Sequence, residues 1–150
     1  MSIEFSPSAR RVVTEGRVAR LATADRAGRP LVVPICYAFD GQHCYSVIDK
    51  KPKRASGERL RRVQNIRENP NVSLLIDHYE EDWARLSYVI IEGHAEILSG
   101  GHEFSAGIDL LLGKYLQYQK MPLDRQAGIM IKMTPHRVIE WRATPVGGFE

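Results

Sequence analysis

The chain has 150 residues, of which 43% are hydrophobic and 26% charged, enough for one domain with its own core, and we expect residues 1–150 to form a single domain. The 21 basic and 18 acidic residues leave a net charge of only +3, which argues against a protein that binds nucleic acid through bulk charge. The sequence has two cysteines, no apolar run near the roughly 18 residues that span a bilayer, and no N-terminal segment typical of a secretion signal. These features predict a cytoplasmic protein without a membrane partner.

The N-terminal segment SPSARRVVTEG predicts a short helix. Ser6 can cap the helix, Pro7 suits its first position, and Gly16 can end it in a left-handed conformation.

Two strand-forming runs, 18–24 and 30–39, follow this helix, and a polar turn with a glycine separates them. Asp40-Gly41 then divides the second run from a third, 43–48, which is a strong hairpin signal. We therefore expect these three runs to form an antiparallel meander.

A second helix is expected from Leu60, Val63 and Ile66, which recur at helical spacing until Asn69-Pro70 stops the helix. This apolar stripe should face a sheet. The side chains of Arg61, Arg62 and Asn65 should lie off it.

The second half of the chain predicts two more strands at 72–77 and 88–98, a helix at 103–120, and a sixth strand at 128–141 that Thr134-Pro135 interrupts. Many short strands and few helices favour a mainly β fold, either a small barrel or a Greek-key sheet.

The segment between the strand run 43–48 and the second helix has the features of an anion site. Lys50, Lys51, Lys53 and Arg54 make a cationic loop, and Arg61-Arg62 follows in the first turns of the helix. A helix start offers free N–H groups and a positive dipole, so a phosphate would meet charge and donors together. A solvated basic loop is the alternative interpretation.

Together these segments resemble the flavin-binding split-barrel superfamily, which includes pyridoxamine 5′-phosphate oxidases and the deazaflavin-dependent oxidoreductases that use coenzyme F420. The resemblance runs from about Gly16 to Trp141. It rests on the strand YSVI, the doublet Arg61-Arg62, the helix end Asn69-Pro70, and the segments RVARLATAD, PLVVPICYAFDG and IEGHAE. The chain ends in WRATPVGGFE and lacks the arginine-rich substrate signature of a true pyridoxamine phosphate oxidase, which argues against a role in vitamin synthesis. The extra charge of the cationic loop favours the F420 branch.

The resemblance implies a homodimeric, six-stranded antiparallel split β-barrel of Greek-key type, with the cofactor in a groove that both subunits line. It implies an F420-dependent oxidoreductase that transfers a hydride between the deazaflavin and a small organic substrate, with FMN as the alternative cofactor. No catalytic acid or base is expected, because the chemistry belongs mainly to the cofactor. The expected cofactor-binding residues are Pro34, Ile35 and Cys36 beside the ring, Ser46, Val47 and Ile48 along its other edge, and Lys50, Lys51, Lys53, Arg61 and Arg62 at the phosphate and tail.

Two other functions stay open. The first is a non-enzymatic flavin or haem protein on the same barrel, in which His43, His78 or His94 could supply an axial ligand. The second is a sensor domain whose cationic loop binds another anion. The five histidines show no ligand spacing, so no metal site is expected.

The two cysteines, Cys36 and Cys44, lie on neighbouring strand runs. A two-residue turn between those runs would place the thiols on opposite faces and exclude a disulfide, whereas a longer turn could return them to one face.

Overall fold

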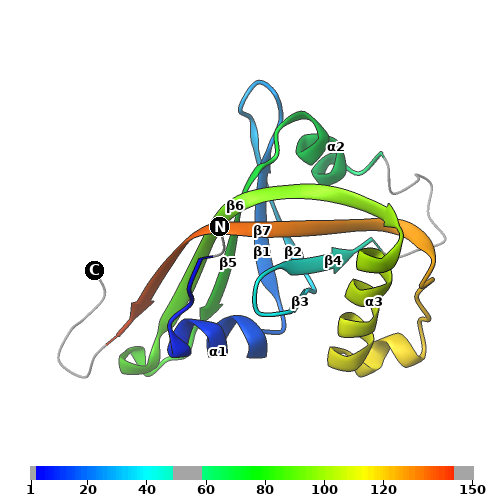
Figure 1. Cartoon of the computed structure of the whole chain (residues 1–150). Coiled ribbons are helices and arrows are strands. Elements are labelled where there is room, and N and C mark those ends of the chain that lie inside the picture. The colour runs from blue at the N-terminus through cyan, green and yellow to red at the C-terminus, as the bar shows by residue number, and fades with distance from the viewer. Residues whose placement is uncertain (1–2, 49–58, 144–150) are drawn as a thin grey trace.

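The computed structural model describes residues 3–48 and 59–143, and within these ranges seven strands form one sheet (Figure 1). The strand order is β2-β1-β5-β6-β7-β4-β3, and all neighbouring strands are antiparallel. The strands are β1 (Ala19–Ala24), β2 (Pro30–Ile35), β3 (Ala38–Phe39), β4 (Cys44–Val47), β5 (Asn71–His78), β6 (Ser87–Gly100) and β7 (Ala127–Arg142). The helices are α1 (Pro7–Glu15), α2 (Arg61–Glu68) and α3 (His102–Lys114), with short 3-10 turns η2 (Trp83–Arg85) and η3 (Leu116–Gln119).

The mainly β, antiparallel fold is confirmed, but the described residues hold seven strands where the sequence predicted six. The run 30–39 divides into β2 and β3 because the amide of Tyr37 donates to the hydroxyl of Tyr115, at 3.1 Å, instead of to a neighbouring strand. The predicted hairpin around Asp40-Gly41 is confirmed, since Phe39 of β3 pairs with Cys44 of β4. The three runs do not form one continuous meander, however, because among the described strands β2 pairs only with β1, and β4 has β7 on its other side, so that Ser46 lies opposite Ile131.

The predicted start of α1 is confirmed, since the Ser6 hydroxyl accepts from the amide of Ala9 at 3.0 Å and Pro7 is the first helical residue. Gly16 does follow the helix, but its φ of −58° is not left-handed as predicted. Close packing explains the glycine instead, because a Cβ there would lie 2.5 Å from the hydroxyl oxygen of Tyr37.

Helix α2 stops before Asn69-Pro70 as predicted, and Val63 and Ile66 are buried. Asn65, which was expected off the buried stripe, is only 2% exposed. Its amide nitrogen donates to the hydroxyl of Thr23 at 3.0 Å, so a polar contact with β1 holds it inside. Helix α3 is shorter than predicted, because the chain leaves the helix at Tyr115.

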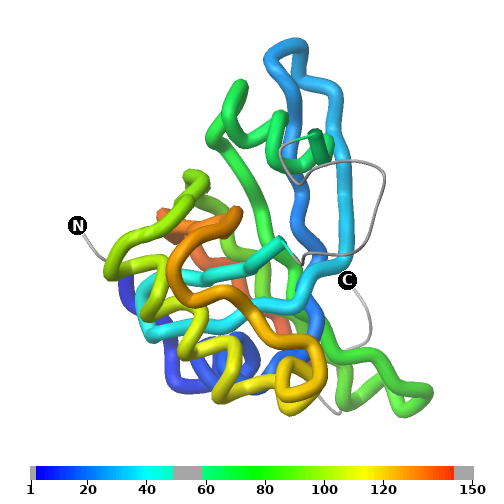
Figure 2. Tube along the Cα trace, turned by 90° about the vertical axis from the view of Figure 1, so that its right-hand side faces the viewer, coloured from blue at the N-terminus to red at the C-terminus, as the bar shows by residue number. Residues whose placement is uncertain are grey.

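Two clusters of buried side chains flank the sheet. One joins α1 to the inward side chains of β1, β5 and β6, and the other joins α3 to β3, β4 and β7. Figures 1 and 2 show α1 and α2 near opposite ends of the sheet. No helix in the described part of the chain is long and apolar enough to cross a membrane.

Candidate functional site

On strands β2, β1, β5 and β6, the sheet face turned away from the cluster around α1 carries apolar side chains. The strand registers place Val32 of β2, Leu75 of β5 and Ile90 of β6 on this outer face. Val32 is 61% exposed, which is unusual for a β-branched side chain in the middle of a strand. Further along, the rings of Tyr88 and Trp141 stack with their centroids 5.4 Å apart. We call these side chains, with Ile139, the outer apolar face.

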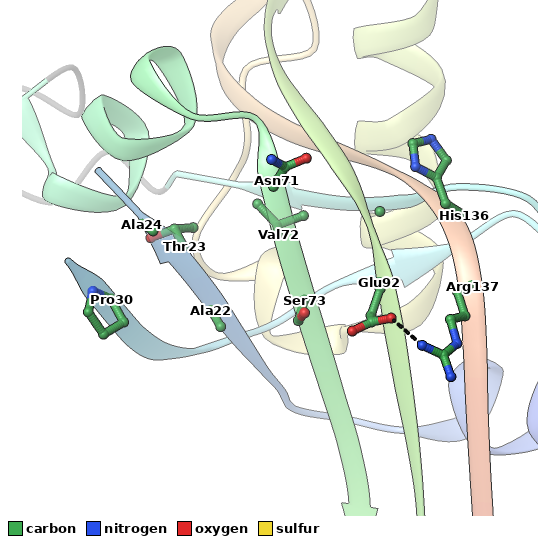
Figure 3. A pocket seen from close by; sticks show the side chains of 11 residues that line it. Ala22, Thr23, Ala24, Pro30, Asn71, Val72, Ser73, Glu92, His136 and Arg137 are labelled. Atoms are coloured by element: carbon green, nitrogen blue, oxygen red, sulfur yellow. Dashed lines mark ion pairs between the residues drawn. The ribbon is translucent and has the colours of Figure 1, made fainter. Parts of the chain in front are cut away.

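A groove of about 470 Å³ opens at one end of the outer apolar face, as Figure 3 shows. One side of it is small and apolar, and the opposite side is polar. The apolar side comprises Ala22, Ala24 and Pro30, and the polar side comprises Asn71, Ser73, Glu92, His136 and Arg137, with Thr23, Val72 and Gly93 completing the lining. The groove has the size of a site for a single small ring compound.

A β-bulge shapes the polar side of the groove. Glu92 pairs with Arg137 and Gly93 pairs with Pro135, so His136 is an extra residue between two ladder positions. Gly93 is required at this point because a Cβ there would lie 2.0 Å from the carbonyl oxygen of Thr134. Bulges turn side chains out of the regular alternation, and here the extra residue is a histidine at the edge of the groove.

Two side-chain pairs lie along this edge, and all of their members except His94 line the groove. Nδ1 of His94 and Nε2 of His136 are 2.8 Å apart, so the two imidazoles share a hydrogen bond, with ring centroids at 4.5 Å. The guanidinium of Arg137 lies 3.5 Å from the carboxylate of Glu92, as the dashed line in Figure 3 marks. The groove therefore offers imidazole, guanidinium and carboxylate groups on one side and a flat apolar surface on the other.

The contact between His94 and His136 was not predicted from the sequence, in which the two residues are 42 positions apart. Two signals of the bulge were available. Gly93 interrupts one strand pattern and Pro135 interrupts the other, and both residue types within strands indicate a bulge or a close backbone approach. Pairing them would have required knowing the register of β6 and β7.

The predicted phosphate residues Arg61 and Arg62 begin α2, with Arg61 exposed and Arg62 half-buried. Leu60 at the N-cap has no side-chain hydrogen bond to the first turn, so a helix start with two arginines fits a phosphate. Thr23, which binds Asn65 of α2, also lines the groove. Thr23 of β1 thus links the middle of α2 to the lining of the groove. Lys50, Lys51 and Lys53 lie outside the described residues.

The other predicted cofactor residues face different ways. Pro34 and Cys36 are exposed, whereas Ile35 between them is 9% exposed and belongs to the core around α1. Ser46 is 5% exposed in β4, and Val47 and Ile48 are half-buried. The predicted meander would have made these two segments neighbouring strands. In the structure β2 and β4 are not neighbours in the sheet. The contacts of these residues with a cofactor stay a prediction.

Cys36 is exposed and Cys44 is buried, and both thiols are free. Burial raises the pKa of the Cys44 thiol to about 12. Within residues 3–48 and 59–143, no group of three or more His, Cys, Asp or Glu side chains is arranged to hold a metal ion.

A second polar cluster joins α3 to the start of β3. The Lys114 ammonium donates to the carbonyl of Tyr37 at 3.0 Å and lies 3.9 Å from the centre of its ring. Arg17 lies over the Tyr115 ring at 4.5 Å and donates to the carbonyl of Lys114. Desolvation, followed by repulsion from Arg17, lowers the pKa of Lys114 to about 8. This cluster lies away from the groove and fixes the end of α3.

A family model for pyridoxamine 5′-phosphate oxidase matches residues 5–142. The chain belongs to this family. Its fold is the flavin-binding split barrel that the sequence predicted, with the sheet left open between β2 and β3. No curated protein sequence matches the chain.

Several solved structures share the family fold. A conserved hypothetical protein of Mycobacterium tuberculosis is 19% identical, with a TM-score of 0.71 over 94% of this chain and 86% of its own. The haem storage protein HutZ of Vibrio cholerae is 15% identical, with a TM-score of 0.70 over 94% of this chain and 98% of its own. An FAD-binding protein of Mesorhizobium loti is 21% identical, with a TM-score of 0.67 over 91% of this chain and 94% of its own. At these identities the likeness concerns the fold.

Proposed function

We propose that this protein is an oxidoreductase that binds a flavin or deazaflavin and transfers a hydride to or from a small organic substrate. Coenzyme F420 is the proposed cofactor and FMN is the alternative. Membership of the pyridoxamine 5′-phosphate oxidase family supports the cofactor class, and the paired arginines at the start of α2 carry the proposal for this chain. When bound, the cofactor supplies the hydride chemistry, while the protein binds, orients and excludes water.

Arg61 and Arg62 would hold the phosphate through charge-assisted hydrogen bonds, aided by the positive end of the helix dipole. The groove would receive the ring of the substrate, because its apolar side is flat and its polar side offers hydrogen-bonding groups at one edge. A second copy of the chain would cover the outer apolar face and complete the site. Because Val32, Leu75 and Ile90 lie on that face, burying it would stabilise a homodimer.

The cofactor is tested by mixing the purified protein separately with F420, FMN, FAD and haemin, removing unbound ligand, and recording the absorbance that the protein retains. We expect F420 to bind more tightly than FMN, because its glutamate tail can reach Lys50, Lys51 and Lys53 while FMN ends at its phosphate. The preference should shrink as salt rises, since exposed charges are screened within about 8–10 Å at ordinary ionic strength.

Replacing Lys50, Lys51 and Lys53 together by Ala should remove most of the F420 preference and leave FMN binding unchanged. Tighter binding of FMN than of F420 by the unmodified protein at low salt would assign the protein to FMN. Retention of none of the three flavin-type ligands would reject the proposal.

Haem binding is a second candidate function, and the His94–His136 pair at the edge of the groove favours it. Either imidazole could serve as an axial ligand through the ring nitrogen that the shared hydrogen bond does not use. The test compares haemin spectra of the unmodified protein with those of His94→Ala and His136→Ala. A spectrum that neither variant changes would exclude the pair as ligands.

A further inference from the structure

We propose that His136, positioned by His94, is the proton donor for the substrate that binds in the groove. This inference rests on the proposed oxidoreductase function and assigns a catalytic group to this chain, where the sequence predicted none. The substrate class is a planar ring compound with a conjugated carbonyl, whose oxygen would lie at the polar edge of the groove.

The first support is the way the backbone places His136. The bulge between β6 and β7 makes His136 an extra residue, and Gly93 permits the close backbone contact that the bulge requires. A regular ladder would have fixed the direction of this side chain by simple alternation. The bulge instead leaves an exposed imidazole at the edge of a groove whose opposite side is apolar.

The second support is the shared hydrogen bond. Because Nε2 of His136 is engaged with Nδ1 of His94 at 2.8 Å, Nδ1 is the nitrogen that His136 has left for a ligand. When His94 donates this hydrogen bond, the neutral His136 must carry its proton on Nδ1, where it can be given away. The shared proton can then move to Nε2 of His136, and His94 regains a proton from solvent. The pair is thus a two-member relay.

The third support is the charge around the pair. The charged groups on this side of the groove are Glu92 and Arg137, which pair with each other at 3.5 Å, and β5 contributes only the uncharged Asn71 and Ser73. The carboxylate of Glu92 therefore has a partner of its own and is not required to hold the imidazole. His136 is left as the group that can supply a proton at this edge.

For a conjugated ketone, a two-electron-reduced flavin or deazaflavin would supply the hydride and His136 the proton. The carbon β to the carbonyl accepts a hydride and forms a C–H bond. The C=C π pair shifts to the bond between the α-carbon and the carbonyl carbon, and the C=O π pair moves to oxygen. That oxygen takes the Nδ1 proton of His136, which gives an enol.

The test uses 4-nitrophenol as a stable mimic of the enol, because its oxygen can exchange a hydrogen bond with an imidazole and its absorbance reports its protonation. The unmodified protein, His136→Gln, His94→Gln and the control His102→Gln, which changes an exposed histidine at the start of α3, are titrated with it. We expect binding to weaken about tenfold or more in His136→Gln, by less in His94→Gln, and not at all in His102→Gln.

Histidine ring signals in NMR provide a second measurement that does not depend on affinity. Those of His94 and His136 should shift together on addition of 4-nitrophenol, and those of His102 should stay in place. Equal binding by the unmodified protein and His136→Gln, or no binding by the unmodified protein, would overturn the inference.

Measuring whether the same variants retain F420 and FMN distinguishes failure of this inference from failure of the proposed function. If the unmodified protein retains a cofactor and binds 4-nitrophenol with the same affinity as His136→Gln, the proton-donor role fails and the proposed function stands. If 4-nitrophenol binding requires His136 but no cofactor is retained, the proposed oxidoreductase function and the donor role in hydride transfer both fail.

Discussion

Neither Arg61 nor Arg62 belongs to a hydrophobic cluster, but Nε of Arg62 is buried, so circular dichroism must first show that the double variant folds. We expect Arg61→Ala with Arg62→Ala to weaken cofactor binding by about a hundredfold or more, since each charge-assisted bond to a phosphate contributes roughly 1.5–3 kcal/mol. Fluorescence titration with F420 and FMN measures the change. The control is Arg11→Ala with Arg142→Ala, which removes the same charge from exposed positions elsewhere. Unchanged affinity in a folded double variant would remove the phosphate assignment.

Lys114 gives a prediction about pH and stability. Its pKa is about 8 in the folded protein, below the ordinary 10.5, so between these values the unfolded chain binds more protons. The contribution of Lys114 to the free energy of unfolding therefore rises as the pH goes from about 8 to 10.5, and it is lowest below about pH 8. Cys44 acts in the opposite direction above pH 9, because its folded pKa is raised from 9.0 to about 12.

The contribution of Lys114 is isolated by comparison with Lys114→Met. The unfolding free energy of the unmodified protein, minus that of the variant, should increase from about pH 8 to about pH 10.5, as measured by urea denaturation. A difference that does not change with pH would show that Lys114 has an ordinary pKa.

At the scale of the elements, the β6–β7 bulge is expected to tolerate no side chain at position 93. Gly93→Ala should lower stability by roughly 1–3 kcal/mol, because the added Cβ meets the carbonyl oxygen of Thr134 and must push the strands apart. Gly113→Ala is the matched control. Its Cβ meets open space in α3, so we expect it to raise stability by roughly 0.5–1 kcal/mol. A neutral Gly93→Ala variant would contradict the close packing.

The elements also show where sequence patterns were sufficient. Local signals placed α1, α2 and most strand runs, because capping residues, periodicity and Asn69-Pro70 act within a few residues. Strand partners depend on distant contacts instead. The break between β2 and β3 comes from a hydrogen bond between Tyr37 and Tyr115, and no pattern near Tyr37 reports it.

The same limit applies to the candidate site. The doublet Arg61-Arg62 could be recognised from its position at a helix start, which is a local property. The groove could not, because its lining comes from five strands, and Asn65 was misplaced because its partner Thr23 lies in another element.

At the scale of the whole molecule, the outer apolar face predicts a dimer of about twice the 17.0 kDa chain in light scattering at micromolar concentration. Val32→Glu should weaken this dimer tenfold or more, because it places a charge in an apolar contact, and cofactor affinity should fall with it. Leu116→Glu, which changes a side chain 71% exposed outside this face, should leave both unchanged. A monomer that still binds cofactor tightly would reject the shared groove.

The long β6–β7 ribbon has a consequence for unfolding. In β7 the neighbouring residues Met130 and Ile131 belong to different hydrophobic clusters, so one stretch of backbone holds both clusters in place. Neither cluster can come apart without loosening the strand that supports the other. Far-ultraviolet circular dichroism and tyrosine fluorescence should therefore report one coincident thermal transition, and two separated transitions would show that the clusters melt independently. The amides in the middle of this ribbon should exchange with solvent only when the whole chain unfolds.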